Sequence, residues 1–200
     1  MGTARTPNTD FLVEQARQGN ASARQELLVR HRSRLRRMVG VHLDRRLAVR
    51  VDPSDVVQEA LARWEATGLT AAQVGLLHSV SFQVADLGGT TLGLQSGTVI
   101  TVDDNAAGWG WFVDATPSDD SEFRKPGNQG EQNHMDLLTV LMHEMGHVLG
   151  LDHEPRGVMQ ETLDPGTRLS PSLLDLHFAG LADSADVALA VALADEAHKR

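Results

Sequence analysis

The chain carries three histidines and a glutamate at a spacing that suits metal-assisted hydrolysis. His143, Glu144, His147, Gly150 and His153 form the pattern H-E-x-x-H-x-x-G-x-x-H. Residues four apart lie on one face of a helix, so His143 and His147 can direct their imidazoles at one ion. Three neutral imidazoles with an open fourth position are typical of catalytic rather than structural zinc sites. Glu144 could then act as general base and acid on a zinc-activated water, which predicts peptide-bond hydrolysis.

The same stretch predicts the elements that position these side chains. A helix should carry the first two histidines and end at Gly150, because glycine takes the left-handed conformation of a helix C-terminus without steric cost. The chain can then turn and bring His153 back toward His143 and His147. Two alternatives remain at this point: a helix whose histidines only cap or pack, and a zinc site without turnover.

Residues 143–153 resemble the active-site motif of the metzincin clan of zinc metallopeptidases, and within it the matrixin-like group. The resemblance covers about residues 62–180 and implies an α+β domain: a small twisted sheet, an active-site helix and a C-terminal helix. It also implies a Zn²⁺ cofactor and a protein or peptide substrate. By that resemblance the zinc ligands are His143, His147 and His153, and Glu144 is the catalytic residue.

The clan places a methionine-containing turn beneath its zinc ion. Met159, in Gly157-Val158-Met159, is our candidate for that residue, and ordinary core filling is the alternative. The stretch that follows looks like the clan's closing helix, with Ser170 as N-cap and Pro171 at the first helical position.

Sequence patterns predict the other elements of residues 66–183. A capping box at Thr70 opens a short helix that ends near His78. Alternating or continuous apolar residues predict strands, and a polar segment rich in Gly, Pro and Asp predicts a loop. The predicted strands are 79–85, 98–102 and 109–113, and the predicted loop is 114–134. We expect Trp109 and Trp111 to lie in the core, with a platform for the substrate as the alternative.

Residues 1–65 have a different character from the rest of the chain. They hold twelve arginines and eight acidic residues, whereas residues 66–200 hold six basic and nineteen acidic ones. Such asymmetry suggests segments of different origin. Helices are expected over 9–19, 22–43 and 53–66, so an all-α segment precedes the α+β domain, and an alanine-rich helical tail over 184–200 follows it.

Residues 10–64 resemble region 2 of extracytoplasmic-function sigma factors. The resemblance implies a contact with RNA polymerase through Asp55, Gln58 and Glu59. Sequence-specific DNA binding is not expected, because the promoter-reading parts of that family do not follow. The alternative function is therefore a polymerase-binding, sigma-like module attached to a vestigial or purely structural zinc domain.

Composition adds a few expectations. With no cysteine there is neither a disulfide framework nor a thiolate metal site. No apolar run approaches membrane-spanning length, so no membrane partner is expected. The protease resemblance suggests an extracellular protein, whereas the N-terminus shows no signal peptide, which suggests the cytoplasm if this is the whole product. Acidic residues offer a possible Ca²⁺ site, with a solvated loop as the simpler interpretation: Asp103, Asp104, Asp119, Asp120 and Glu122.

Overall fold

A computed structural model describes residues 53–124 and 130–178, together with isolated positions between 11 and 26. The tail predicted at 184–200 lies outside the described residues, and so do most residues of the helices predicted at 9–19 and 22–43. Within the described ranges, no helix is both long and apolar enough to span a membrane.

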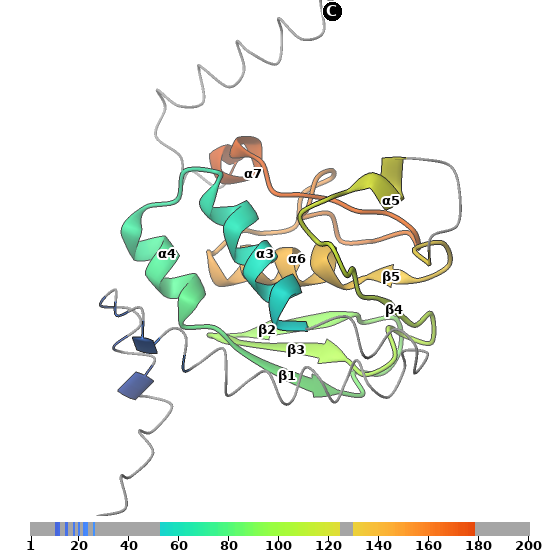
Figure 1. The fold of residues 1–200 in the computed structure, drawn as a ribbon, viewed down its shortest axis with the longest axis horizontal. Helices are drawn as coiled ribbons and strands as arrows, with labels where there is room; N and C mark the ends of the chain where they lie inside the picture. Colours follow the sequence, from blue (N-terminus) through green and yellow to red (C-terminus); the bar gives the residue numbers. More distant parts are fainter. Residues whose placement is uncertain are drawn as a thin grey trace, which may run out of the picture.

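A three-stranded sheet forms one layer of the domain (Figure 1). Strand β3 (Val99–Asp103) lies in the middle, parallel to β1 (Ser81–Ala85) and antiparallel to β2 (Gly93–Ser96). The sequence correctly predicted β1 and β3 to within two residues at either end. It missed β2, which forms an edge of this sheet.

Three helices form the second layer and cover one face of the sheet: α3 (Pro53–Glu65), α4 (Ala71–His78) and α6 (Leu137–Val148) (Figure 1). The capping box predicted at Thr70 is confirmed, since Thr70 and Gln73 exchange both of its hydrogen bonds. Asp136 is the N-cap of helix α6, and its carboxylate accepts the Thr139 N–H at 3.0 Å. This layer order is that of an α+β domain.

Helix α3 shares a core with the sheet and α6. Trp64 is fully buried, and its indole N–H donates to the Met142 carbonyl of α6 at 2.9 Å. Other residues of this core include Val56, Val57, Ala60, Leu61, Phe82, Ile100 and Val102. The helix predicted over 53–66 is therefore confirmed. Although the sequence grouped it with an N-terminal segment ending at residue 65, it packs inside the α+β domain.

Short elements complete the fold. Strands β4 (Trp111–Phe112) and β5 (Met135–Asp136) pair in parallel. Helices α5 (Ser121–Arg124) and α7 (Leu173–Phe178) lie at the periphery of the domain (Figure 1).

Several sequence predictions need correction at this level. Residues 114–134, predicted as loop, include α5. The closing helix begins after Ser172, whose hydroxyl and N–H both donate to Asp175, and not after Ser170. Of the two tryptophans expected in the core, Trp111 is buried but Trp109 is 51% exposed.

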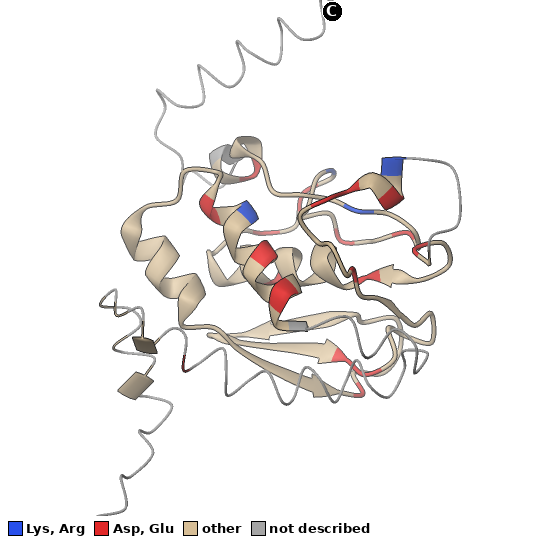
Figure 2. Ribbon diagram, in the orientation of Figure 1, with Lys and Arg blue, Asp and Glu red and all other residues tan. Residues whose placement is uncertain are grey.

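A buried ion-pair cluster ties the helical layer to the loops beside it. The Arg168 guanidinium, whose side chain is 2% exposed, pairs with Asp114 at 2.7 Å, Asp136 at 2.8 Å and Asp120 at 3.0 Å. Arg63 of α3 joins it through a 2.7 Å pair with Asp120. Figure 2 shows acidic segments on α3 and around α5, with few basic ones among them.

Candidate functional site

The C-terminal end of α6 sets the direction of the chain after the first two histidines. Gly150 has φ 87°, the left-handed conformation. The Gly150 N–H donates to the His147 carbonyl and the Leu151 N–H to the Gly146 carbonyl, both at 3.0 Å. These two hydrogen bonds form a Schellman motif, which ends the helix and turns the chain. The predicted role of Gly150 is confirmed, and the turn brings His153 back to α6.

The imidazoles of His143, His147 and His153 converge on one point. Their Nε2 atoms are 3.0 Å apart between His143 and His147, and 3.2 Å from each of these to His153. Among the described residues, these three histidines are the group of His, Cys, Asp or Glu side chains whose ligand atoms lie close enough together to hold one metal ion. The first two rings are partly buried and the third is exposed.

Backbone carbonyls fix the orientation of two of these rings. His143 Nδ1 lies 2.9 Å from the Val158 carbonyl, and His147 Nδ1 lies 2.8 Å from the Leu151 carbonyl. Because a carbonyl only accepts, the proton of each neutral ring belongs on Nδ1. The two Nε2 lone pairs therefore face each other at 3.0 Å with no proton between them. That arrangement is repulsive in the absence of a cation.

Electrostatics favour a neutral imidazole at His143, as metal binding requires. Burial lowers the pKa of His143 to about 4; the hydrogen bond to Val158 opposes the shift, and the neighbouring imidazoles of His147 and His153 add to it. Tetrahedral zinc with Zn–N bonds of about 2.0–2.1 Å would hold ligand nitrogens about 3.3 Å apart. The observed separations of 3.0–3.2 Å fit that donor set.

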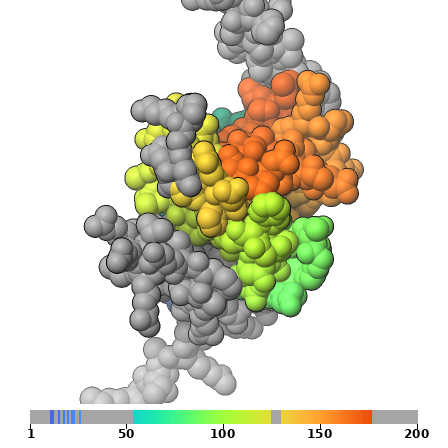
Figure 3. Space-filling model, turned by 90° about the vertical axis from the view of Figure 1, so that its right-hand side faces the viewer, coloured from blue at the N-terminus to red at the C-terminus, as the bar shows by residue number. Residues whose placement is uncertain are grey.

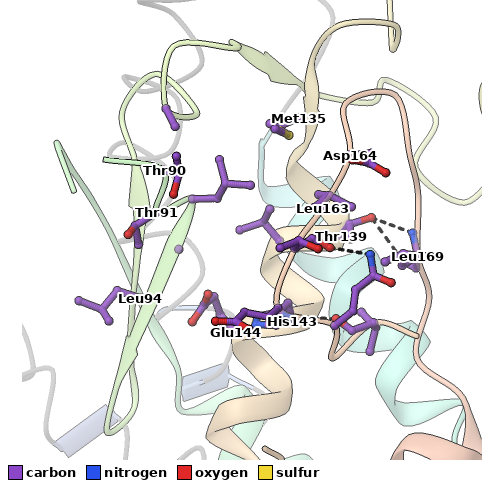
Figure 4. A pocket seen from close by; sticks show the side chains of 18 of the residues that line it. Thr90, Thr91, Leu94, Met135, Thr139, His143, Glu144, Leu163, Asp164 and Leu169 are labelled. Atoms are coloured by element: carbon purple, nitrogen blue, oxygen red, sulfur yellow. Dashed lines mark hydrogen bonds between the residues drawn. The ribbon is translucent and has the colours of Figure 1, made fainter. Parts of the chain in front are cut away.

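Glu144 points from α6 toward β2 (Figure 4). It is 5% exposed, and burial raises the pKa of its carboxyl group to about 7, against a lowering hydrogen bond from the Gln95 backbone. Its carboxyl group packs against Gly93, where a β-carbon would lie 2.5 Å from Oε1. Strand β2 therefore holds the Glu144 side chain beside the three histidines. Glu144 is not one of the residues whose ligand atoms converge on one point.

A cavity of about 760 Å³ opens in front of these residues. Residues 90–95 line one side, residues 160–165 and Leu169 the other, and α6 lies at its base with Thr139, Val140 and His143 (Figure 4). Figure 3 shows the face on which the segment after α6, in orange, adjoins the yellow-green strand segment. The histidines and Glu144 thus border a cleft large enough for part of a peptide.

The turn at Gly157-Val158-Met159 lies beneath the site. Met159 is fully buried, and its sulfur lies against Gly146, so close that a β-carbon on Gly146 would overlap it. The preceding residue, Val158, supplies the carbonyl that orients His143. These contacts support both interpretations of Met159, as a core residue and as the methionine under the site.

Hydrogen bonds and ion pairs that involve Arg168 hold the cleft wall at Leu169 against the start of α6. The Leu169 N–H donates to Thr139 Oγ1 at 3.0 Å, and that hydroxyl donates to Asp136 at 2.6 Å. Asp136 in turn pairs with Arg168. The pattern of the sequence gave no indication of this anchor, because its members are up to 54 residues apart.

The possible calcium site finds no support. The Asp103 carboxylate accepts N–H groups of Leu87, Asn105 and Ala107 at 2.8–3.2 Å, and burial, which raises its pKa, is outweighed by these bonds so that the pKa is lowered. Burial likewise raises the pKa of Asp120, but its two arginine partners lower it overall. These carboxylates bind donors of the protein itself.

The residues assigned to polymerase contact lie on α3. Asp55 and Gln58 are exposed, and Glu59 pairs with Arg63 at 2.8 Å. Neither this arrangement nor the comparisons with known proteins support a contact with RNA polymerase.

Sequence reasoning missed Gly93 and Gln95 as partners of Glu144, because it missed β2. The available signal was the alternation of Leu92, Leu94 and Ser96 between turns at Gly88-Gly89 and Gly97.

The chain matches no curated protein and no solved structure. The matrixin family, a family of peptidases, matches residues 45–174, which is more than half of the chain and includes α3 as well as the histidine motif. The chain therefore belongs to the matrixin family of metallopeptidases.

Proposed function

We propose that this protein is a zinc-dependent endopeptidase that hydrolyses peptide bonds in the cleft along α6. The observation that carries the proposal is the convergence of three imidazole Nε2 atoms within 3.2 Å of one another, with the Glu144 carboxyl group in the same cleft. Membership of the matrixin family supports the same reaction class.

The zinc ligands in this proposal are His143, His147 and His153. A bound zinc ion supplies Lewis acidity, which lowers the pKa of a nucleophilic water and polarises the scissile carbonyl. The Val158 and Leu151 carbonyls keep the Nδ1 proton on His143 and His147, so both rings present Nε2 as a lone-pair donor.

Glu144 is the proton carrier in this proposal. Its carboxylate takes the proton of the attacking water and delivers it to the leaving amine. The packing of its carboxyl group on Gly93 and its hydrogen bond from the Gln95 backbone restrict where the carboxylate can move. Strand β2 therefore acts as the support of the general base.

Metal removal and restoration tests this function. The purified chain, incubated with blocked peptides, is expected to cleave them, to lose activity after dialysis against a chelator, and to regain it with one equivalent of zinc. A His153→Ala variant should bind zinc more weakly, because a ligand is lost. Cleavage that persists in zinc-free protein would overturn the proposal.

A further inference from the structure

One tryptophan lies exposed at the mouth of the cleft. Trp109 is 51% exposed, whereas Trp64 and Trp111 are buried. Four large hydrophobic residues are exposed within the described part of the chain, and two of them, Trp109 and Leu94, line the cavity that contains His143 and Glu144. Large apolar side chains that remain exposed beside a binding cleft mark a contact surface.

The loop that carries Trp109 is held in a strained conformation. Ala106 and Ala107 have φ values of 57° and 54°, in the left-handed region that a residue with a β-carbon rarely adopts. Such strain persists only where the surroundings enforce it, and it concentrates at functional sites.

Buried groups enforce this strain. Asp103 Oδ2 accepts the N–H groups of Ala107 at 2.8 Å and Asn105 at 3.2 Å, and the Asn105 side chain accepts the Gly108 N–H. The Gly110 carbonyl accepts the Met135 N–H at 3.0 Å, which ties the loop to the start of α6. Trp109 is thus presented by a loop that is fixed at both ends.

The loop places Trp109 in the same cavity as the histidines. Trp109, His143, Glu144 and His147 all line that cavity. A peptide bound in the cleft can therefore contact Trp109 and the histidines at the same time.

We propose that Trp109 forms a specificity subsite that binds an aromatic or large aliphatic side chain of the peptide. The proposal rests on the proposed endopeptidase function. The indole face offers offset stacking or edge-to-face packing to an aromatic ring, and Leu94 adds apolar surface in the same cavity.

The test separates binding from catalysis. The zinc-loaded Glu144→Ala chain is titrated with a series of nine-residue peptides. Each peptide has a leucine at its centre and alanine and serine at the other positions, except for one phenylalanine. The phenylalanine stands at a different position in each peptide of the series. Because Trp109 is the exposed one of the three tryptophans, its emission should shift to the blue when phenylalanine stands at the one position of the peptide that reaches Trp109. The shift should vanish in Trp109→Phe, which keeps an aromatic ring and should keep the affinity.

Trp109→Ala should weaken binding of that peptide about tenfold and leave the other peptides unchanged. In the active chain the same change should raise KM with little effect on kcat. Leu174→Ala is the matched control, since Leu174 is also exposed but does not line the cavity. Circular dichroism checks that each variant is folded.

Two results would overturn the subsite: equal affinity of Trp109→Ala for every peptide, or no emission shift at saturating concentrations of any of the peptides. Failure of the endopeptidase function gives a different result, namely peptide binding with a Trp109 shift but no cleavage by the chain with Glu144 intact.

Discussion

The carboxyl group of Glu144 lies against Gly93, so that a β-carbon on residue 93 would come within 2.5 Å of Oε1 and 2.8 Å of Cγ. The two residues are 51 positions apart and belong to α6 and β2. Only a residue without a side chain leaves Glu144 its place in the cleft, which makes β2 part of the proposed catalytic arrangement.

Gly93→Ala is therefore expected to displace Glu144 from the cleft. Peptide hydrolysis should fall by about tenfold or more, because a general base that is out of position contributes little. Zinc content should remain as in the unchanged chain, since none of the histidines contacts Gly93 in this way. Ser96→Ala on the same strand is the control, because Ser96 is exposed. Unaltered hydrolysis in Gly93→Ala would show that Glu144 needs no such space.

Arg168→Met should destabilise the domain strongly. The change leaves the buried carboxylates of Asp114 and Asp136 without their cation, and breaking a buried pair in this way costs about 3–5 kcal/mol of unfolding free energy. Urea unfolding followed by circular dichroism measures the loss. Arg168→Lys keeps the charge but cannot pair with several carboxylates at once, and should fall in between. Arg156→Met, at an exposed position, should change little.

Trp64→Ala tests whether α3 is integral to the domain. The fully buried indole fills space between α3 and α6 and donates to the Met142 carbonyl, so its removal should cost about 3–5 kcal/mol. Trp64→Phe retains most of the volume and loses chiefly the hydrogen bond, at about 1 kcal/mol. Thermal unfolding compares the variants. A melting temperature of Trp64→Ala equal to that of the unchanged chain would mean that α3 packs only loosely.

Asp103→Asn tests the hydrogen bonds by which Asp103 holds the loop that carries Trp109. The pKa of Asp103 lies below its ordinary value of 3.8, so the stability it contributes is complete above that pH and is lost as the pH falls through the folded-state pKa. The variant should lose about 1–3 kcal/mol at neutral pH, because an asparagine has one accepting oxygen where the carboxylate has two, so its NH2 group must face either the Leu87 N–H or those of Asn105 and Ala107.

The unfolding free energy of the Asp103→Asn variant should also depend less on pH than that of the unchanged chain as the pH falls below 3.8. Asp86→Asn, an exposed position, serves as the control. Parallel pH profiles for the Asp103→Asn variant and the unchanged chain would contradict this role of Asp103.

The contiguous part of the site could be predicted from the sequence. His143, His147, Gly150 and His153 lie within eleven residues, and helix periodicity with a glycine terminus determines how they meet. The parts that could not be predicted come from distant segments. The carbonyl of Val158, the space at Gly93 and the anchor at Arg168 depend on packing that no local pattern encodes.

The helices and strands likewise divide into those that local sequence patterns predict and those that depend on packing between distant segments. Helix α4 and strands β1 and β3 were predicted because a capping box and apolar strand patterns are local signals. Strand β2 has four residues, begins at a glycine and has only a partly buried face, so its signal was weak. The helix over 53–66 was predicted, but only the structure shows that it packs against α6.

The most direct test of the account compares zinc content and peptide hydrolysis in the unchanged chain and in Glu144→Ala. The account predicts one zinc ion per chain in both proteins and loss of hydrolysis by about a hundredfold or more in the variant. Hydrolysis at an undiminished rate in Glu144→Ala, or an unchanged chain that binds no zinc, would contradict it.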